Sequence, residues 1–243
     1  MPIQEKSLTL SVQSAMKIEP VTGAVITPIF QTSTYKQKAP GKDLGYDYSR
    51  GGNPTRTSLE KTLARLEFAN HALSFSSGLA AEQAIIQIIE PGSKVLVCDD
   101  VYGGTGRLFR SLYSKYKIEF VFIDMTDETI VEKHLGKDVS LIWIETPTNP
   151  TLKIIDIEKI CQKAKKISAL TVVDNTFSSP MFQNPLKLGA DIVVHSLTKY
   201  IGGHTDVIGG ALMMNAKDLY EKLSFVQMAV GAIPSPFDCF LLT

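Results

Sequence analysis

From residue 58 onward, the chain alternates between amphipathic segments and short apolar runs. Apolar residues recur at intervals of three and four in SLEKTLARLEFA, LAAEQAIIQII and DIEKICQKAKKI, which predicts three helices. A further helix is expected over residues 106–116. Short runs rich in Val and Ile predict strands. These strand segments are HALSF, KVLVCD, EFVFID, LIWIET, LTVVDN, ADIVVHS and IGGALMMN.

Continuous apolar strands that alternate with helices are typical of a mainly parallel sheet with helices on both faces. We therefore expect an open α/β layer fold. Ligands of such sheets bind outside the carboxyl ends of the strands. The residues directly after each predicted strand are therefore the first candidates for a functional site.

Residues 1–57 differ from this pattern because they are polar and rich in turn-forming residues, including Pro28, Pro40 and the pair Gly51-Gly52. We expect an extended arm with one or two short helices, followed by the main domain from residue 58 to 243.

Charge and composition narrow the class of protein. Among the 243 residues, Lys plus Arg and Asp plus Glu both number 25, so no net charge attracts the chain to nucleic acid. The start, MPIQEKSLTL, lacks the apolar core of a secretory signal, and no apolar run is long enough to span a bilayer. We expect a cytoplasmic protein that acts on small molecules, with neither nucleic-acid nor membrane partners.

The cysteines and histidines indicate neither disulfides nor a metal site. Cys98, Cys161 and Cys239 are scattered and form no CxxC pair, as in a reducing compartment. The four histidines show no metal-ligand spacing such as HExxH, so no metal is expected.

The segment SSGLAAE follows the first predicted strand. Ser77 and Gly78 would open a helix there, and the unpaired N–H groups of a helix start can bind a phosphate. The alternative is that Ser77 only caps the helix beside a turn glycine.

Two other strands are followed by side chains that suit a flat cofactor. Tyr102 precedes Gly103 and Gly104, so its ring could stack on a ligand or act as an acid or base; it could equally be a surface tyrosine. Asn149 lies in the stiff loop TPTNP and can both donate and accept hydrogen bonds, although the loop could be a simple Pro-rich turn.

The same region partly imitates a dinucleotide fingerprint. Gly104 and Gly106 form GxG, and Asp124 ends the next strand. However, Phe109 occupies the third glycine position, and the loop before the first glycine is too long for the tight turn of that motif. A nicotinamide enzyme is therefore a minor alternative.

The strongest candidates follow the last apolar strands. Asp174 ends the strand LTVVD, where a carboxylate needs a cation or good donors, and Thr176 lies two residues on. The alternative there is an Asx turn. Ser196, Thr198 and Lys199 follow ADIVV in the stretch HSLTKYIGGHTD.

Together these groups fit one ligand, pyridoxal 5′-phosphate (PLP). Asp174 would pair with the protonated pyridine nitrogen, and Lys199 would form a Schiff base through its ε-nitrogen. The phosphate would be held by Ser196, Thr198 and the helix start Ser77–Leu79.

The same residues belong to segments that carry a resemblance to a known family. The chain resembles the Cys/Met-metabolism group of PLP enzymes, which includes the cystathionine γ-lyases and γ-synthases. The matching segments cover nearly the whole chain in order. They are GYDYSRGGNPTR, SSGLAA, DDVYGGT, WIETPTNPT, VVDNTF, HSLTKYIGGHTDV and GAIPSPFDC.

The resemblance implies a fold type I PLP transferase-like large domain and specific residue roles. Lys199 carries the cofactor and moves protons on the substrate, and Tyr102 stacks on the ring and helps deprotonate the incoming amine. Asp174 pairs with the ring nitrogen, Thr176 lies near the ring, and Asn149 contacts the cofactor oxygen or the substrate carboxylate.

The resemblance also implies an assembly. Tyr48 and Arg50 match residues that reach across a dimer to the phosphate of the neighbouring subunit, and the planar guanidinium of Arg suits that role. The segment 1–57 is then an intersubunit arm, and the protein a homo-oligomer, a dimer of dimers in the family.

Within the family, we expect γ-elimination of cystathionine to cysteine, 2-oxobutanoate and ammonia. GAIPSPFDC looks most like the γ-lyases, and Gly104 stands where methionine γ-lyases tend to carry cysteine. The alternative is a γ-synthase, which joins cysteine to an O-acyl-homoserine.

The sequence ends at DCFLLT, whereas family members continue into a C-terminal domain that supplies the arginine for the substrate α-carboxylate. We expect that domain to be absent, the apolar stretch 240–242 to be exposed, and turnover by this chain to be poor. A form that binds the cofactor without catalysis is a further alternative.

Overall fold

The computed structural model describes residues 9, 11, 12 and 18–243. The first part of the expected arm lies outside the described residues, as does most of the N-terminal stretch MPIQEKSLTL.

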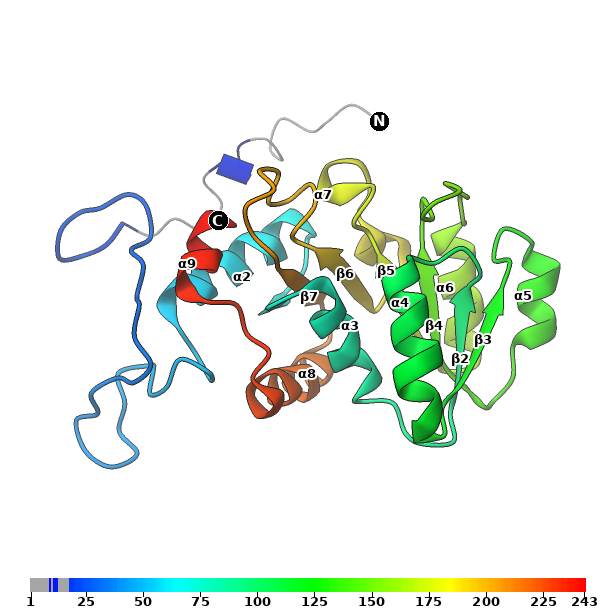
Figure 1. Ribbon diagram of the computed structural model, residues 1–243, viewed down its shortest axis with the longest axis horizontal. Coiled ribbons are helices and arrows are strands. Elements are labelled where there is room, and N and C mark those ends of the chain that lie inside the picture. Colours follow the sequence, from blue (N-terminus) through cyan, green and yellow to red (C-terminus); the bar gives the residue numbers. More distant parts are fainter. Residues whose placement is uncertain (1–8, 10, 13–17) are drawn as a thin grey trace.

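Within the described residues, seven strands form one sheet in the order β1-β7-β6-β5-β4-β2-β3 (Figure 1). Strands β2 to β6 pair in parallel, whereas β7 is antiparallel to both β1 and β6. Every strand except β7 therefore runs in one direction, which confirms the mainly parallel α/β fold. The strands are β1 (His71–Phe75), β2 (Lys94–Cys98), β3 (Glu119–Ile123), β4 (Val139–Glu145), β5 (Leu170–Asp174), β6 (Ile192–Ser196) and β7 (Gly210–Met214).

Helices cover the sheet and connect its strands (Figure 1). The α-helices are α2 (Pro54–Leu66), α3 (Gly78–Ile86), α4 (Gly103–Arg107), α5 (Glu128–His134), α6 (Ile157–Lys166), α7 (Ser179–Phe182), α8 (Lys217–Val230) and α9 (Pro236–Leu241). The other helical segments are the π-helix η1 (Leu108–Tyr113) and the 3₁₀-helices η2 (Ser114–Tyr116) and η3 (Pro185–Leu188).

Two helices begin earlier than the sequence predicts. Helix α2 begins at Pro54, because the side chain of Asn53 accepts the N–H groups of Thr55 and Arg56. This helix therefore crosses the expected boundary at residue 57. The helix expected over 106–116 begins at Gly103 as α4 and continues as the π-helix η1.

Alternating side chains on the strands pack against different helices. Val193 and Met213 lie in an apolar cluster with Leu59 of α2 and Cys239 of α9. Neighbouring strand residues point to the opposite face, where Leu212 packs in a larger core that includes residues of α3 and α8. The sheet is therefore buried on both sides.

The apolar stretch at 240–242 is not fully exposed, contrary to the sequence expectation. Leu242 is buried and belongs to the cluster beneath α2 and α9, because the short helix α9 turns it inward.

Residues 18–52 form an extended segment that projects beyond α2 (blue in Figure 1). No helix occurs between residues 18 and 53; isolated bridges join Thr34 to Tyr48 and Ala39 to Lys42. The segment is attached to α2 by the N–H of Phe30, which donates to Thr55 Oγ1 at 2.9 Å.

We expect β4, an interior strand of the sheet, to be sensitive to the loss of a single methyl group. Ile142 is fully buried, so Ile142→Val should lower the free energy of unfolding by about 0.5–1.5 kcal/mol. The matched change Ile154→Val, at a side chain that is 69 % exposed, should alter it by less than about 0.5 kcal/mol. Urea unfolding of both variants measures the difference, and equal losses would contradict the expectation.

Candidate functional site

A cavity of about 420 Å³ opens at the carboxyl ends of the strands. Its walls come from segments that follow β1, β2, β4, β5 and β6, as expected for an open parallel sheet. Every candidate from residue 77 onward lines it. These residues are Ser77, Gly78, Leu79, Tyr102, Asn149, Asp174, Thr176, Ser196, Thr198 and Lys199.

The start of helix α3 forms one wall. Ser77 caps the helix, since its Oγ accepts the N–H of Ala80 at 3.1 Å. The N–H groups of Gly78 and Leu79 precede the first hydrogen bond of the helix, so they have no partner within it. A Cβ on Gly78 would lie 3.2 Å from Ser196 Cβ, and one on Gly210 would lie 2.1 Å from the Ser77 carbonyl oxygen. Glycine at both positions lets this helix start pack closely against β6 and β7.

Asp174 ends β5 as a buried carboxylate. Thr176 donates to Asp174 Oδ1 twice, from its N–H at 2.9 Å and from its Oγ1 at 2.6 Å, so the Asx turn that was the alternative interpretation of this segment is present. Burial raises the pKa of Asp174, whereas the Thr176 hydrogen bonds and the nearby His195 oppose this shift. Among the described residues, no lysine or arginine forms an ion pair with Asp174, so a cationic ligand group would stabilise it.

Lys199 follows β6 in a turn. The Lys199 N–H donates to the Ser196 carbonyl oxygen at 3.3 Å, and Thr198 Oγ1 accepts the N–H of Gly209 at 3.1 Å. The Lys199 side chain is exposed and lines the cavity, and within the described chain it forms no ion pair. Its amine is therefore available to a ligand.

Tyr102 lies over the glycines that follow β2. A Cβ on Gly104 would lie 2.3 Å from Tyr102 Cε1, so the ring occupies the space that a side chain would fill. Tyr102 is 44 % exposed and lines the cavity. Gly104 and Gly106 lie inside α4 rather than in a tight turn, which removes the geometric basis of the dinucleotide alternative.

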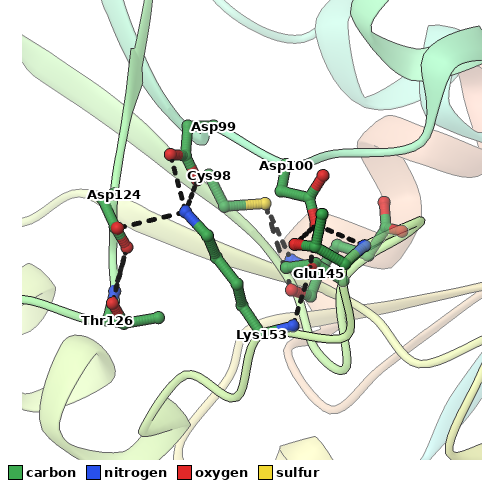
Figure 2. A network of polar contacts seen from close by, with 9 residues as sticks. Cys98, Asp99, Asp100, Asp124, Thr126, Glu145 and Lys153 are labelled. Atoms are coloured by element: carbon green, nitrogen blue, oxygen red, sulfur yellow. Dashed lines mark hydrogen bonds and ion pairs between the residues drawn. The ribbon is translucent and has the colours of Figure 1, made fainter.

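Asn149 lies in a loop that a polar network ties to β2 and β3. Figure 2 shows Lys153 reaching Asp99, with Nζ–Oδ2 at 2.8 Å, and Asp124, with Nζ–Oδ2 at 3.1 Å. Asp100 accepts the Thr151 N–H at 2.9 Å in the same network. The loop that carries Asn149 is therefore fixed relative to the one that carries Tyr102.

The cavity also contains two carboxyl groups that the sequence analysis missed, Glu82 and Glu145. The N–H of Tyr102 donates to Glu145 Oε2 at 2.8 Å, and Thr105 Oγ1 donates to Glu82 Oε1 at 3.0 Å. Burial and the charge of Asp174 raise the pKa of Glu145 to about 8 and that of Glu82 well above its usual range. Phe177 and Ile208 complete the missed lining residues.

Glu145 should make the stability of the ligand-free chain pH-dependent. Its pKa is higher in the folded protein than its ordinary value of 4.5, so its contribution is fully present below pH 4.5 and is lost as pH rises to about 8. As the pH rises from 4.5 to about 8, we expect the melting temperature of Glu145→Gln to rise relative to that of the parent protein. The exposed control Glu221→Gln should differ from the parent in melting temperature by the same amount throughout this pH range. A constant difference for Glu145→Gln would contradict the raised pKa of Glu145.

Tyr48 and Arg50 do not line this cavity. Tyr48 is 44 % exposed, and Arg50 Nη1 donates to the Met228 carbonyl oxygen at 3.0 Å. Their expected role concerns the cavity of a second subunit, so their positions within one chain do not test it.

The donor set fits PLP. A helix start with free N–H groups and the hydroxyls of Ser196 and Thr198 suit a phosphate, and the buried carboxylate of Asp174 suits a protonated ring nitrogen. Lys199 supplies the unpaired amine that would bond an aldehyde. In the part of the chain that the structure describes, no three His, Cys, Asp or Glu side chains are arranged so that they could hold a metal ion. No helix of that part is long and apolar enough to cross a membrane.

Comparisons with known proteins identify relatives of the chain. The family model described as Cys/Met metabolism PLP-dependent enzyme matches residues 8–243. The chain is 51 % identical to a probable cystathionine γ-synthase from Herpetosiphon aurantiacus, over 96 % of this chain and 73 % of that protein. It is 50 % identical to a putative cystathionine γ-lyase 2 from Caenorhabditis elegans, over 90 % of this chain and 56 % of that protein.

The fold is shared with solved structures. The cystathionine γ-lyase of Lactobacillus plantarum, solved as a complex with L-serine, superposes with a TM-score of 0.94 at 39 % identity, over 97 % of this chain and 62 % of that one. The chain thus spans between 56 % and 73 % of the length of these relatives.

Proposed function

Because the chain belongs to the family of Cys/Met-metabolism PLP-dependent enzymes, we propose that it binds PLP in the strand-end cavity and forms the cofactor-binding part of a cystathionine γ-lyase. The observation that carries this proposal is the pairing in one cavity of the buried Asp174 carboxylate with the unpaired amine of Lys199.

Each wall of the cavity would hold one part of the cofactor. The first turn of α3, with Ser196 and Thr198, binds the phosphate, and Asp174 holds the ring nitrogen in its protonated form. Thr176 supports Asp174 through its two hydrogen bonds. When bound, PLP supplies an electron sink for charge at the α-carbon of the substrate.

Two side chains are placed to move protons. Tyr102 would stack on the ring and accept a proton from the substrate amine, whereas the Lys199 amine would take the proton from the α-carbon. Asn149 would orient the cofactor oxygen or the substrate carboxylate.

We propose that cystathionine and water yield cysteine, 2-oxobutanoate and ammonia. This reaction is supported by the γ-lyase names of a curated relative at 50 % identity and of a solved structure at 39 % identity. A γ-synthase is the second candidate, because the relative at 51 % identity carries that name. Supplying O-acyl-homoserine with cysteine, or cystathionine alone, to separate samples distinguishes the two reactions by their products.

The cofactor proposal is tested by covalent trapping. The chain is incubated with one equivalent of PLP, reduced with borohydride, digested, and mapped by mass spectrometry, with excess free lysine present to suppress surface labelling. We expect one label, on Lys199. A label confined to another lysine, or no label, would refute the proposal.

The proposal extends to assembly and location. Tyr48 and Arg50 would reach the phosphate of a second copy of the chain from the arm 1–57, within a dimer of dimers in the cytoplasm. The exposure of Tyr48 and the projection of residues 18–52 beyond α2 support this arrangement (Figure 1). Light scattering of the purified protein measures the number of subunits, and a monomer would exclude it.

A further inference from the structure

A buried carboxylate lies beneath the ends of β5 and β6. Glu67, the C-cap residue of α2, is fully buried, and its Oε1 accepts a hydrogen bond from Asn175 Nδ2 at 2.7 Å. His195 Nε2 lies 2.6 Å from the same oxygen. The other oxygen, Oε2, has no hydrogen-bond partner among the described residues. One carboxylate oxygen thus joins two neighbouring strand ends.

This contact lies on the opposite face of the sheet from the cavity. Asn175 directly follows Asp174, and His195 directly precedes Ser196, and successive side chains of a strand point to opposite faces. On the cavity face, Thr176 joins the same strand ends, because it donates to Asp174 and accepts the Ser196 N–H at 2.9 Å. The two strand ends are therefore held from both faces.

A similar contact joins the other ends of the same strands. Asp191, just before β6, accepts the N–H of Thr171 at 2.7 Å and its Oγ1 at 2.8 Å. This carboxylate lies at the amino-terminal end of β5 and β6, away from the cavity. It provides a natural control for the contact at Glu67.

The energetics of the Glu67 contact favour a role beyond packing. A buried carboxylate with an oxygen that lacks a partner destabilises the fold, and apolar side chains of similar size commonly serve stability as well or better. In some proteins a buried polar contact of this kind selects one geometry among alternatives.

We propose that Glu67 is a positioning residue of the cofactor site, which holds the ends of β5 and β6 in register from the α2 face and thereby fixes Asp174 relative to Ser196 and Lys199. The expected effect of Glu67 on PLP binding rests on the proposed function, whereas its expected effect on the strand ends does not.

The first test needs no cofactor. Glu67→Ala removes the partner of His195 Nε2 and one of the two acceptors of Asn175 Nδ2, which also donates to the Gln183 carbonyl oxygen at 2.8 Å. The backbone N–H groups of Asn175 and Ser196 bond Val194 O and Thr176 Oγ1, so their hydrogen exchange reports on the two strand ends and should accelerate at least tenfold. Asp191→Ala should leave exchange at these two amides within threefold of the parent. Equal acceleration by both variants, or none by Glu67→Ala, would overturn the inference.

The second test uses PLP. Glu67→Ala should raise the dissociation constant of PLP at least tenfold and weaken the visible circular dichroism of the bound cofactor, whereas Asp191→Ala should keep both near the parent values. Glu67→Gln should restore binding to within threefold, because its amide oxygen still accepts both donors. A parental dissociation constant and dichroism in Glu67→Ala would contradict the role.

A further variant keeps the test decisive if Glu67→Ala does not fold. The double change Glu67→Leu/His195→Leu replaces the buried pair by apolar side chains, which typically preserves stability. It should fold and still show fast exchange at Asn175 and Ser196; slow exchange would refute the inference. Failure of the parent chain to bind PLP would refute the proposed function, and the exchange result would then decide the positioning role alone.

Discussion

Lys199→Ala should abolish covalent retention of PLP and lower the rate of 2-oxobutanoate release from cystathionine by about 10²- to 10⁴-fold. The change removes the one amine of the cavity that is free of an ion pair among the described residues, and with it the group that would take the α-proton. This range accounts for the loss of proton transfer alone. The loss of covalent attachment should lower the rate further.

Borohydride reduction followed by dialysis measures cofactor retention, and a coupled dehydrogenase assay measures 2-oxobutanoate. Lys217→Ala is the matched control, since Lys217 is exposed and its one ion pair in the described part of the chain is with Glu221 on α8. Covalent label or a parental rate in Lys199→Ala would show that another residue holds the cofactor.

Asp174→Asn should lower the rate of 2-oxobutanoate release by about 10²- to 10³-fold, because it removes the charge that would keep the ring nitrogen protonated. The local geometry should persist, since the amide oxygen can still accept the N–H and hydroxyl of Thr176. The effect should therefore fall mainly on kcat, with PLP affinity less affected.

Steady-state kinetics and a PLP titration separate the two quantities. Asp191→Asn is the control, because it makes the same change at the start of β6, where the carboxylate bonds only Thr171 in the described structure. A kcat within twofold of the parent for Asp174→Asn would exclude the assigned role of the carboxylate.

Most of the site could be predicted from the sequence because parallel strands bring their carboxyl ends to one edge. Asp174, Ser196 and Tyr102 each follow an apolar run, so the strand pattern alone placed them together. Glu145 ends β4 just as Asp174 ends β5, so the same rule applies to it, although at that strand end only Asn149 is predicted from the sequence.

Other residues could not be found from the sequence for physical reasons. Glu82 lies within α3, and only the packing of that helix against Thr105 brings it to the cavity. The contact between Glu67 and His195 joins residues 128 positions apart, and no local pattern encodes it. Helix starts were misplaced where a side-chain cap such as Asn53 decided the boundary.

The position of β7 has a consequence for the order in which the molecule folds. In the described sheet, β1 pairs only with β7, although about 135 residues separate them in the chain. The parallel strands β2 to β5 can pair with nearer neighbours, so we expect them to assemble first. The start of α3 would reach β6 only after β7 has entered the sheet, so the wall of the cavity that we propose to bind the phosphate would be one of the last parts of the native structure to form.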